Sequence, residues 1–119
     1  MFEVRVTGQF SAAHNLRGYR GKCEELHGHN WKVEVIVAGE KLDKTGMLMD
    51  FTQLKALLNK VLDRLDHKYI SRLTHFKRIN PTSENIAKYI YESLKTKTPG
   101  LKSVTVWESD YSSASYYGK

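Results

Sequence analysis

The 119-residue sequence has one cysteine, two prolines and no long uninterrupted apolar run. The single cysteine, Cys23, cannot form a disulfide within the chain, so we expect a protein of the reducing cytoplasm. No stretch approaches the length of a membrane-spanning helix. The first ten residues alternate apolar and polar side chains, unlike a signal peptide. These shortages exclude a disulfide-stapled secreted scaffold and a helical membrane protein.

The composition is that of an ordinary globular protein, with 40% hydrophobic and 27% charged residues, and we expect one domain over residues 1–119. The net charge of +6 favours an anionic partner. No basic stripe is interleaved with aromatic residues, so we expect an anionic metabolite rather than nucleic acid. The basic residues form two loose clusters: Arg17, Arg20 and Lys22, then Lys77 and Arg78.

The apolar pattern at the start of the chain has the period of a strand. Phe2, Val4 and Val6 alternate with polar residues, which predicts a half-buried strand that continues toward Ala12. Residues 31–37 alternate in the same way. The sequence therefore predicts two long antiparallel strands joined by a polar loop.

The period then changes to that of a helix. Asp50 can cap a first helix, and a second begins at Thr82 or Ser83 and stops before residues 98–100. The first helix carries one apolar stripe, formed by Phe51, Leu54, Leu57, Leu58, Val61, Leu62 and Leu65.

Two further strands, over residues 101–109 and 114–119, complete the order strand-strand-helix-helix-strand-strand. This order predicts an α+β fold, a four-stranded antiparallel sheet with two helices on one face. Such a sheet has two unpaired edges. Pairing those edges with other copies would protect them, so we expect a symmetric homo-oligomer.

Three histidines form a candidate metal site. His27 and His29 point the same way if Gly28 is extended, because alternate strand residues share a face. His14 ends the first predicted strand and would lie across from them if the two strands are antiparallel neighbours. Three neutral histidines with one open position are the usual arrangement of a catalytic zinc site.

Cys23 and the pair Asp66-His67 have several interpretations. Cys23 could be a buried apolar residue, a fourth zinc ligand or a thiolate that moves protons. His67 could be a favourable cation at a helix end, or an imidazole whose tautomer is fixed by Asp66. The residues alone leave these alternatives open.

Five segments, in order through nearly the whole chain, resemble the 6-pyruvoyl/6-carboxy-tetrahydropterin synthase family: CEELHGHNWKVEV, TGMLMDFTQLK, LDHKYI, NPTSENIAKYI and VWESDYSSASYYG. The resemblance implies the tunnelling fold (T-fold), in which sheets from several subunits close into a barrel and active sites lie between subunits. We therefore expect a homo-oligomer, a hexamer or a tetramer.

The resemblance also implies roles for the candidate residues. The three histidines would bind Zn²⁺, and Cys23 would be the catalytic thiol rather than a fourth ligand. Asp66 and His67 would form its partner dyad.

Three further residues match the family's substrate contacts. Glu108, in VWES, resembles the family's anchor for the pterin ring, whose two-donor edge suits a carboxylate. Without the family it would be an exposed charge at a strand end. Thr82 and Ser83 fall where the family places hydroxyls against the pterin, although helix capping explains them equally well.

Three residues separate Cys23 from His27, as in the 6-carboxytetrahydropterin synthases of queuosine biosynthesis. The resemblance thus implies a zinc-dependent lyase that converts 7,8-dihydroneopterin triphosphate to 6-carboxy-5,6,7,8-tetrahydropterin, releasing acetaldehyde and triphosphate. The alternative is a 6-pyruvoyltetrahydropterin synthase, which eliminates triphosphate without cleaving the side chain. From another class, a non-catalytic zinc protein and an RNA-binding module remain.

Overall fold

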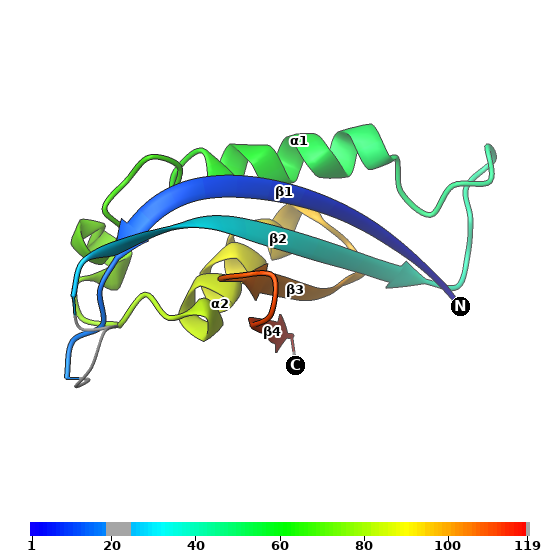
Figure 1. Cartoon of the computed structure of the whole chain (residues 1–119). Helices are drawn as coiled ribbons and strands as arrows, with labels where there is room; N and C mark the ends of the chain where they lie inside the picture. The colour runs from blue at the N-terminus through cyan, green and yellow to red at the C-terminus, as the bar shows by residue number, and fades with distance from the viewer. Residues whose placement is uncertain (19–24, 119) are drawn as a thin grey trace.

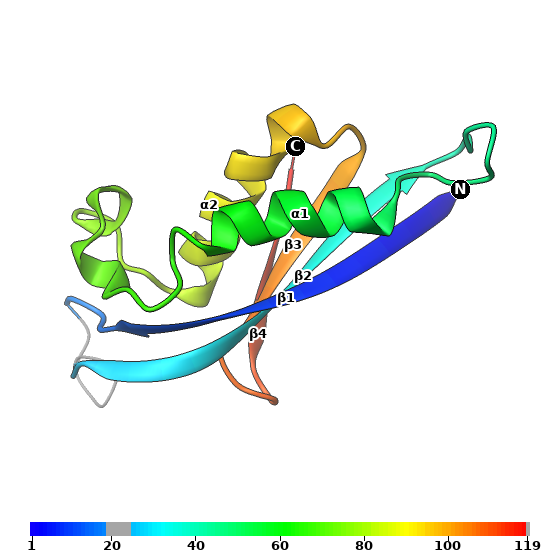
Figure 2. The same cartoon turned by 90° about the horizontal axis from the view of Figure 1, so that it is seen from above.

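The computed structural model describes residues 1–18 and 25–118. Its four strands form one antiparallel sheet in the order β1-β2-β3-β4, as the sequence predicts. The helices α1 and α2 follow β2 in the chain and cover one face of this sheet (Figures 1 and 2). The elements are β1 (Phe2–His14), β2 (His27–Gly39), α1 (Phe51–Leu62), α2 (Ser83–Leu94), β3 (Leu101–Trp107) and β4 (Ser113–Tyr117). Short 3₁₀ turns cover Ile70–Arg72, Thr74–Phe76 and Lys95–Lys97.

The long hairpin of β1 and β2 sets the register of the whole fold. Val6 pairs with Val35, and Phe10 pairs with Trp31. All four side chains are buried, because paired residues of neighbouring strands point to the same face. The core therefore lies between this face and the helices, and the same face continues to the far end of the hairpin.

Both helices begin at the predicted caps. The Asp50 carboxylate accepts a hydrogen bond from the Thr52 N–H at 2.8 Å, and the Thr82 hydroxyl accepts one from the Asn85 N–H at 3.1 Å. α2 ends at Leu94, and a 3₁₀ turn precedes residues 98–100.

Most of the predicted apolar stripe of α1 is buried: Leu54, Leu58, Val61, Leu62 and, beyond the helix, Leu65. The prediction is wrong for Phe51, whose exposed fraction is 58%. Phe51 stands in the first turn and lines an open surface cleft with Phe2 and Met47 instead of packing into the core.

The outer strands of the sheet are β1 and β4. The segment after α1 covers part of the β1 edge: the His67 N–H donates to the Ser11 carbonyl at 2.6 Å, and the Ala13 N–H to the Lys68 carbonyl at 3.1 Å. Within the described ranges no further strand pairs with either edge. Neither helix of these ranges is long and apolar enough to cross a membrane.

Candidate metal centre

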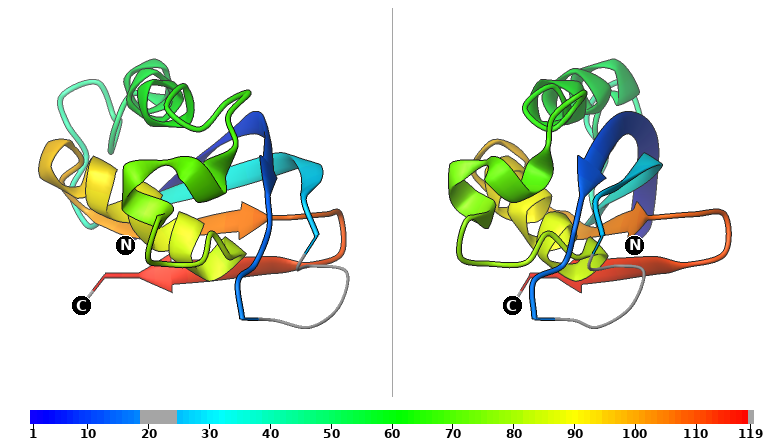
Figure 3. Two further views of the ribbon diagram at one scale, coloured as in Figure 1. Left: turned by 90° about the vertical axis from the view of Figure 1, so that its left-hand side faces the viewer. Right: turned by 60° about the vertical axis from the view of Figure 1, so that its left-hand side comes forward.

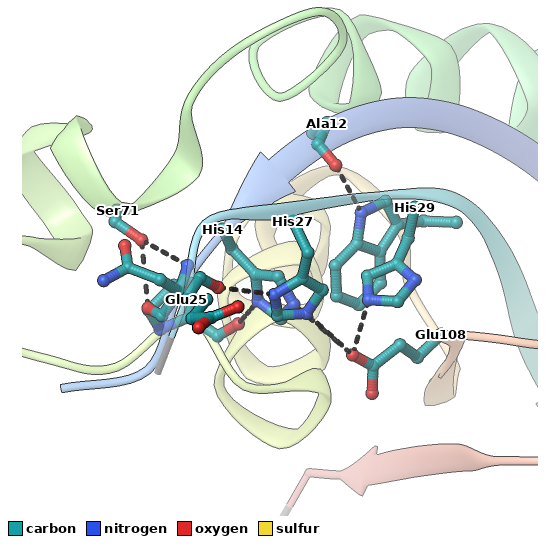
Figure 4. A network of polar contacts seen from close by, with 10 residues as sticks. Ala12, His14, Glu25, His27, His29, Ser71 and Glu108 are labelled. Atoms are coloured by element: carbon teal, nitrogen blue, oxygen red, sulfur yellow. Dashed lines mark hydrogen bonds and ion pairs between the residues drawn. The ribbon is translucent and has the colours of Figure 1, made fainter. Parts of the chain in front are cut away.

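The register of β1 and β2 brings the three candidate histidines together. His14 pairs with His27, and Ala12 pairs with His29, so all three imidazoles lie on the core face at the end of the hairpin. Their ring centroids are 4.5 Å apart for His14 and His27, 4.7 Å for His27 and His29, and 5.4 Å for His14 and His29. Figure 4 shows the three rings converging on one point. Metal binding by this cluster stays a prediction.

Backbone carbonyls fix the tautomers of two of these histidines. Nδ1 of His14 lies 2.7 Å from the Pro81 carbonyl oxygen, and Nδ1 of His27 lies 2.8 Å from the Glu25 carbonyl oxygen. A carbonyl only accepts hydrogen bonds, so each Nδ1 carries the hydrogen. In the neutral ring Nε2 then keeps its lone pair, which is the atom that a metal ion binds.

The burial of His14 and His29 also supports a role as metal ligands. His14 is 2% exposed, and the Nε2 atoms of His14 and His29 are buried without a hydrogen-bond partner among the described residues. Burial lowers the pKa of His14 and likewise that of His29, which favours the neutral rings. Buried polar atoms are normally paired. Two buried imidazole nitrogens aimed at one point, with the Glu108 carboxylate oxygen beside them, fit a bound cation.

Glu108 is the unexpected neighbour of these nitrogens. It follows β3, and its Oε1 lies 3.3, 3.8 and 2.9 Å from the Nε2 atoms of His14, His27 and His29 (Figure 4). From the sequence, Glu108 is expected only as a pterin anchor or as an exposed charge at a strand end. The alternation of Val104, Val106 and Glu108 could have placed it on the histidine face, because every second strand residue shares a face.

Trp31 packs against the histidine cluster from the core side. Its side chain is fully buried, and its ring stands edge-on to His14 and His29, with centroids 4.8 and 5.2 Å away. The indole N–H donates to the Ala12 carbonyl at 3.3 Å. These contacts restrict the rotation of two imidazoles. The alternation of residues 31–37 predicts only that Trp31 lies on the apolar face of a strand.

The four side chains together could hold one metal ion. The ligand atoms of His14, His27, His29 and Glu108 all lie within 4.8 Å of one another. Imidazole nitrogens and a carboxylate oxygen suit zinc and several other divalent transition metals. The residues present therefore fit a metal centre of the predicted kind.

Asp66 and His67 lie outside this cluster, beside the outer edge of β1. Nδ1 of His67 is 3.0 Å from Oδ2 of Asp66, as expected of a dyad. The Ser11 N–H, which donates to Oδ1 at 2.9 Å, holds the pKa of Asp66 below its ordinary value. The His67 side chain is 82% exposed, on left-handed backbone with φ 57°. The dyad is formed but faces solvent in the single chain.

The remaining predicted residues have mixed placements. Cys23 lies outside the described residues, as do Arg20 and Lys22. Thr82 is the N-cap of α2, and Ser83 is its first residue. Both directly follow Pro81, whose carbonyl oxygen orients His14.

Arg17 is tied to the protein itself. Its Nη2 donates to the carbonyl oxygens of Phe76 and Ile79 at 2.6 and 3.1 Å, and its backbone N–H donates to the Asn80 side chain. These bonds hold the chain beyond His14 against the segment before α2. They also commit one nitrogen of the guanidinium, which makes Arg17 a poorer anion ligand than its charge indicates.

A sequence profile described as 6-pyruvoyl tetrahydropterin synthase matches residues 3–119. The chain belongs to this family. The resemblance drawn from the five segments is thereby confirmed.

Individual relatives carry three different names. A Synechocystis sp. protein named 6-carboxy-5,6,7,8-tetrahydropterin synthase is 42% identical over 114 residues, covering 91% of this chain and 87% of that protein. A Pyrococcus furiosus protein named dihydroneopterin monophosphate aldolase is 39% identical over 104 residues, covering 85% and 84%. The structure of Caenorhabditis elegans 6-pyruvoyl tetrahydropterin synthase matches with a TM-score of 0.89 at 33% identity, covering 99% of this chain and 96% of that one. The α+β fold of the family is thus confirmed.

Proposed function

We propose that the protein is a zinc-dependent 6-carboxy-5,6,7,8-tetrahydropterin synthase of the queuosine type. It converts 7,8-dihydroneopterin triphosphate to the 6-carboxy product, with release of acetaldehyde and triphosphate. The observation that carries the proposal is the cluster of three imidazoles whose Nε2 atoms converge at a partly buried point, in a chain of this family. The relatives named 6-carboxy synthases and the three-residue gap between Cys23 and His27 support the carboxy type.

Different residues of the chain bind the metal, bind the pterin and transfer protons. Zinc held by the three Nε2 atoms would supply a Lewis acid for the vicinal hydroxyls of the substrate side chain. Glu108 accepts the two N–H groups of the aminopyrimidine edge, and the Thr82 and Ser83 hydroxyls lie against the pterin. Cys23 and His67 move protons along the side chain, each as acid or base at its sulfur or ring nitrogen.

Asp66 prepares His67 for this role. The carboxylate accepts the Nδ1–H of His67 at 3.0 Å, which leaves Nε2 of the neutral ring to take a proton. The Ser11 N–H keeps Asp66 ionised by favouring the carboxylate. The dyad can therefore store a proton without Asp66 itself becoming protonated.

The position of the dyad favours an active site shared between subunits. β1 stands between Asp66-His67 and the histidines of β2, so one chain does not bring dyad and metal ligands into contact. A second chain at the open part of the β1 edge could present its own dyad to the metal cluster. We therefore infer a homo-oligomer, a hexamer or a tetramer, with sites at the interfaces.

Complementation tests this sharing. His14→Ala and His67→Ala proteins are each expected to be inactive, and unfolding and refolding them together should form some intact sites if the two residues come from different subunits. No recovery of activity in a correctly assembled mixture would place both residues in one chain's site.

A second candidate is aldol cleavage of dihydroneopterin monophosphate, because a relative with that name is about as similar as the 6-carboxy synthases. The fold and the metal cluster serve either reaction. The substrates differ in their phosphates, so the proposed synthase releases inorganic triphosphate and an aldolase acting on the monophosphate does not.

The test is product analysis with both substrates. The zinc-loaded protein is expected to release acetaldehyde from the triphosphate and to leave the monophosphate unchanged, and Cys23→Ala should abolish turnover while keeping the metal. Cleavage of the monophosphate alone would establish the aldolase. The pyruvoyl product without acetaldehyde would establish the pyruvoyl synthase.

A further inference from the structure

Glu108 stands where a fourth ligand of the metal would stand. Zinc bonds of about 2.05 Å place the corners of a tetrahedral site about 3.3 Å apart. The distances from Oε1 of Glu108 to the three Nε2 atoms, 3.3, 3.8 and 2.9 Å, straddle that value. The carboxylate oxygen thus lies at the distance of a fourth ligand from the nitrogens, and all four atoms lie within 4.8 Å of one another.

The hydrogen-bond partners of two of the rings also suit a cation among these atoms. Nδ1 of His14 and Nδ1 of His27 donate to backbone carbonyls, so Nε2 is the ring nitrogen that each histidine turns toward the carboxylate. A carboxylate oxygen accepts hydrogen bonds and donates none. A metal ion among them would be bound by the free Nε2 atoms of the histidines and by the carboxylate oxygen together.

A carboxylate in this position cannot anchor the pterin at the same time. The two N–H groups of the aminopyrimidine edge need both carboxylate oxygens, and Oε1 is directed at the histidines. The substrate's hydroxyl side chain lies across the ring from that edge. If the substrate's hydroxyl side chain reaches the metal, its aminopyrimidine edge lies on the far side of the pterin ring. A carboxylate that binds this edge must therefore lie one ring system away from the metal.

The structure gives Glu108 room to make this change. Its side chain is 32% exposed, and its second oxygen points away from the imidazoles (Figure 4). It follows the last residue of β3, in a turn that extends away from the helices (Figure 3). A hydrogen bond from its N–H to the Ser112 carbonyl, at 3.1 Å, holds its backbone in place.

We propose that Glu108 is the fourth metal ligand of the resting protein and leaves the metal to bind the pterin edge. Recognition of the pterin then opens the metal position that the substrate hydroxyls occupy. A molecule without that edge does not displace Glu108 from the metal. Water and unrelated diols are therefore kept from the fourth coordination position. The identity of the displacing ligand rests on the proposed function, whereas the resting ligation rests on the geometry alone.

The resting ligation is tested by zinc affinity, measured on the full chain in competition with a chromophoric chelator. Glu108→Gln keeps the shape of the side chain and removes its charge. It should weaken zinc binding by at least about tenfold, since even an outer-shell partner of a metal ligand contributes roughly 10- to 100-fold. Asp110→Asn removes the same charge from the exposed turn two residues away and should leave the affinity unchanged. Equal affinities of Glu108→Gln and wild type overturn the proposal.

The exchange is tested with unsubstituted pterin, which has the two-donor edge and no side-chain hydroxyls. If one carboxylate serves both partners, zinc weakens pterin binding, and pterin weakens zinc binding by the same factor. The metal-free protein should therefore bind pterin more tightly than the zinc-loaded protein. Equal or tighter binding with zinc overturns the exchange.

Turnover separates this proposal from the proposed function. A protein that converts the triphosphate but shows no antagonism between zinc and pterin overturns the exchange and leaves the reaction standing. A protein that shows the antagonism and lacks turnover supports the exchange and contradicts the reaction. Absence of pterin binding in both metal states overturns the exchange together with the assigned substrate class.

Discussion

Trp31→Phe should weaken both the fold and the metal centre. Trp31 is fully buried beneath His14 and His29, and its indole N–H donates to the Ala12 carbonyl. Phenylalanine keeps an aromatic ring in the strand but is smaller and has no donor. The change therefore removes packing under two imidazoles together with one hydrogen bond.

The expected loss of stability follows from these contacts. The smaller side chain has about three fewer ring atoms, which at about 0.8 kcal/mol per buried group comes to roughly 2 kcal/mol. The hydrogen bond to Ala12 is long, at 3.3 Å, and adds about 0.5 kcal/mol. The sum of about 2.5 kcal/mol corresponds to a urea midpoint about 1 M lower, for a slope near 2 kcal/mol per M.

The assay is urea unfolding of the metal-free protein at one fixed concentration, because assembly makes stability concentration-dependent. Zinc affinity is measured in parallel and should fall about tenfold, the effect of a group that orients ligands without binding the metal. The control is Trp107→Phe. Trp107 is half-buried on the opposite face of the sheet beside Lys32, and its substitution should cost less than about 1 kcal/mol and leave zinc binding unchanged.

The two tryptophan variants together can refute this reasoning. If Trp31→Phe unfolds earlier but binds zinc like the wild type, then Trp31 packs the core without positioning the imidazoles. If both variants lose the same unfolding free energy, burial beneath the histidines does not make Trp31 more important than Trp107. The loss worked out from the Trp31 contacts is then wrong.

Three further predictions concern a ligand, a backbone position and a loop. His14→Ala should weaken zinc binding by more than about 100-fold in the chelator competition, since it removes a ligand outright; unchanged affinity would exclude His14 as a ligand. Gly100→Ala should lower the unfolding free energy by about 2 kcal/mol or more in urea melts, because Gly100 has φ 80° and a Cβ would lie 2.6 Å from the Ala38 carbonyl oxygen. A wild-type midpoint would contradict that strain. Hydrogen bonds, first from the Thr45 hydroxyl, hold the pKa of Asp43 below its ordinary value, so its contribution is present above about pH 4 and is lost as the pH falls through the lowered pKa. Asp43→Asn should flatten this part of the acid unfolding profile, and an unchanged profile would show that the loop contributes nothing.

Strand periodicity carried most of the fold prediction. Alternation in residues 2–12 and 31–37 gave both long strands, and their antiparallel pairing was enough to bring His14 across from His27 and His29. A two-residue period leaves only two faces, so one correct register places every side chain of the hairpin. The helix starts at residues 51 and 83 were equally predictable, because capping side chains act locally.

Contacts between distant segments were beyond the sequence. The Pro81 carbonyl that orients His14 is 67 residues away, and only the packing of the loop before α2 against the end of β1 brings it there. Glu108 reaches the histidines through the pairing of β2 with β3, whose register no local pattern specifies. Phe51 looked like a core residue because the helical period does not show where the sheet beneath the helix ends.

The most direct test of the central claim is acetaldehyde release from 7,8-dihydroneopterin triphosphate by the metal-free protein before and after one equivalent of zinc per chain. We predict no acetaldehyde without zinc, and acetaldehyde with 6-carboxy-5,6,7,8-tetrahydropterin once zinc is bound. Release that is equally fast without metal, or no release from the zinc-loaded oligomer, would contradict a zinc-dependent carboxytetrahydropterin synthase.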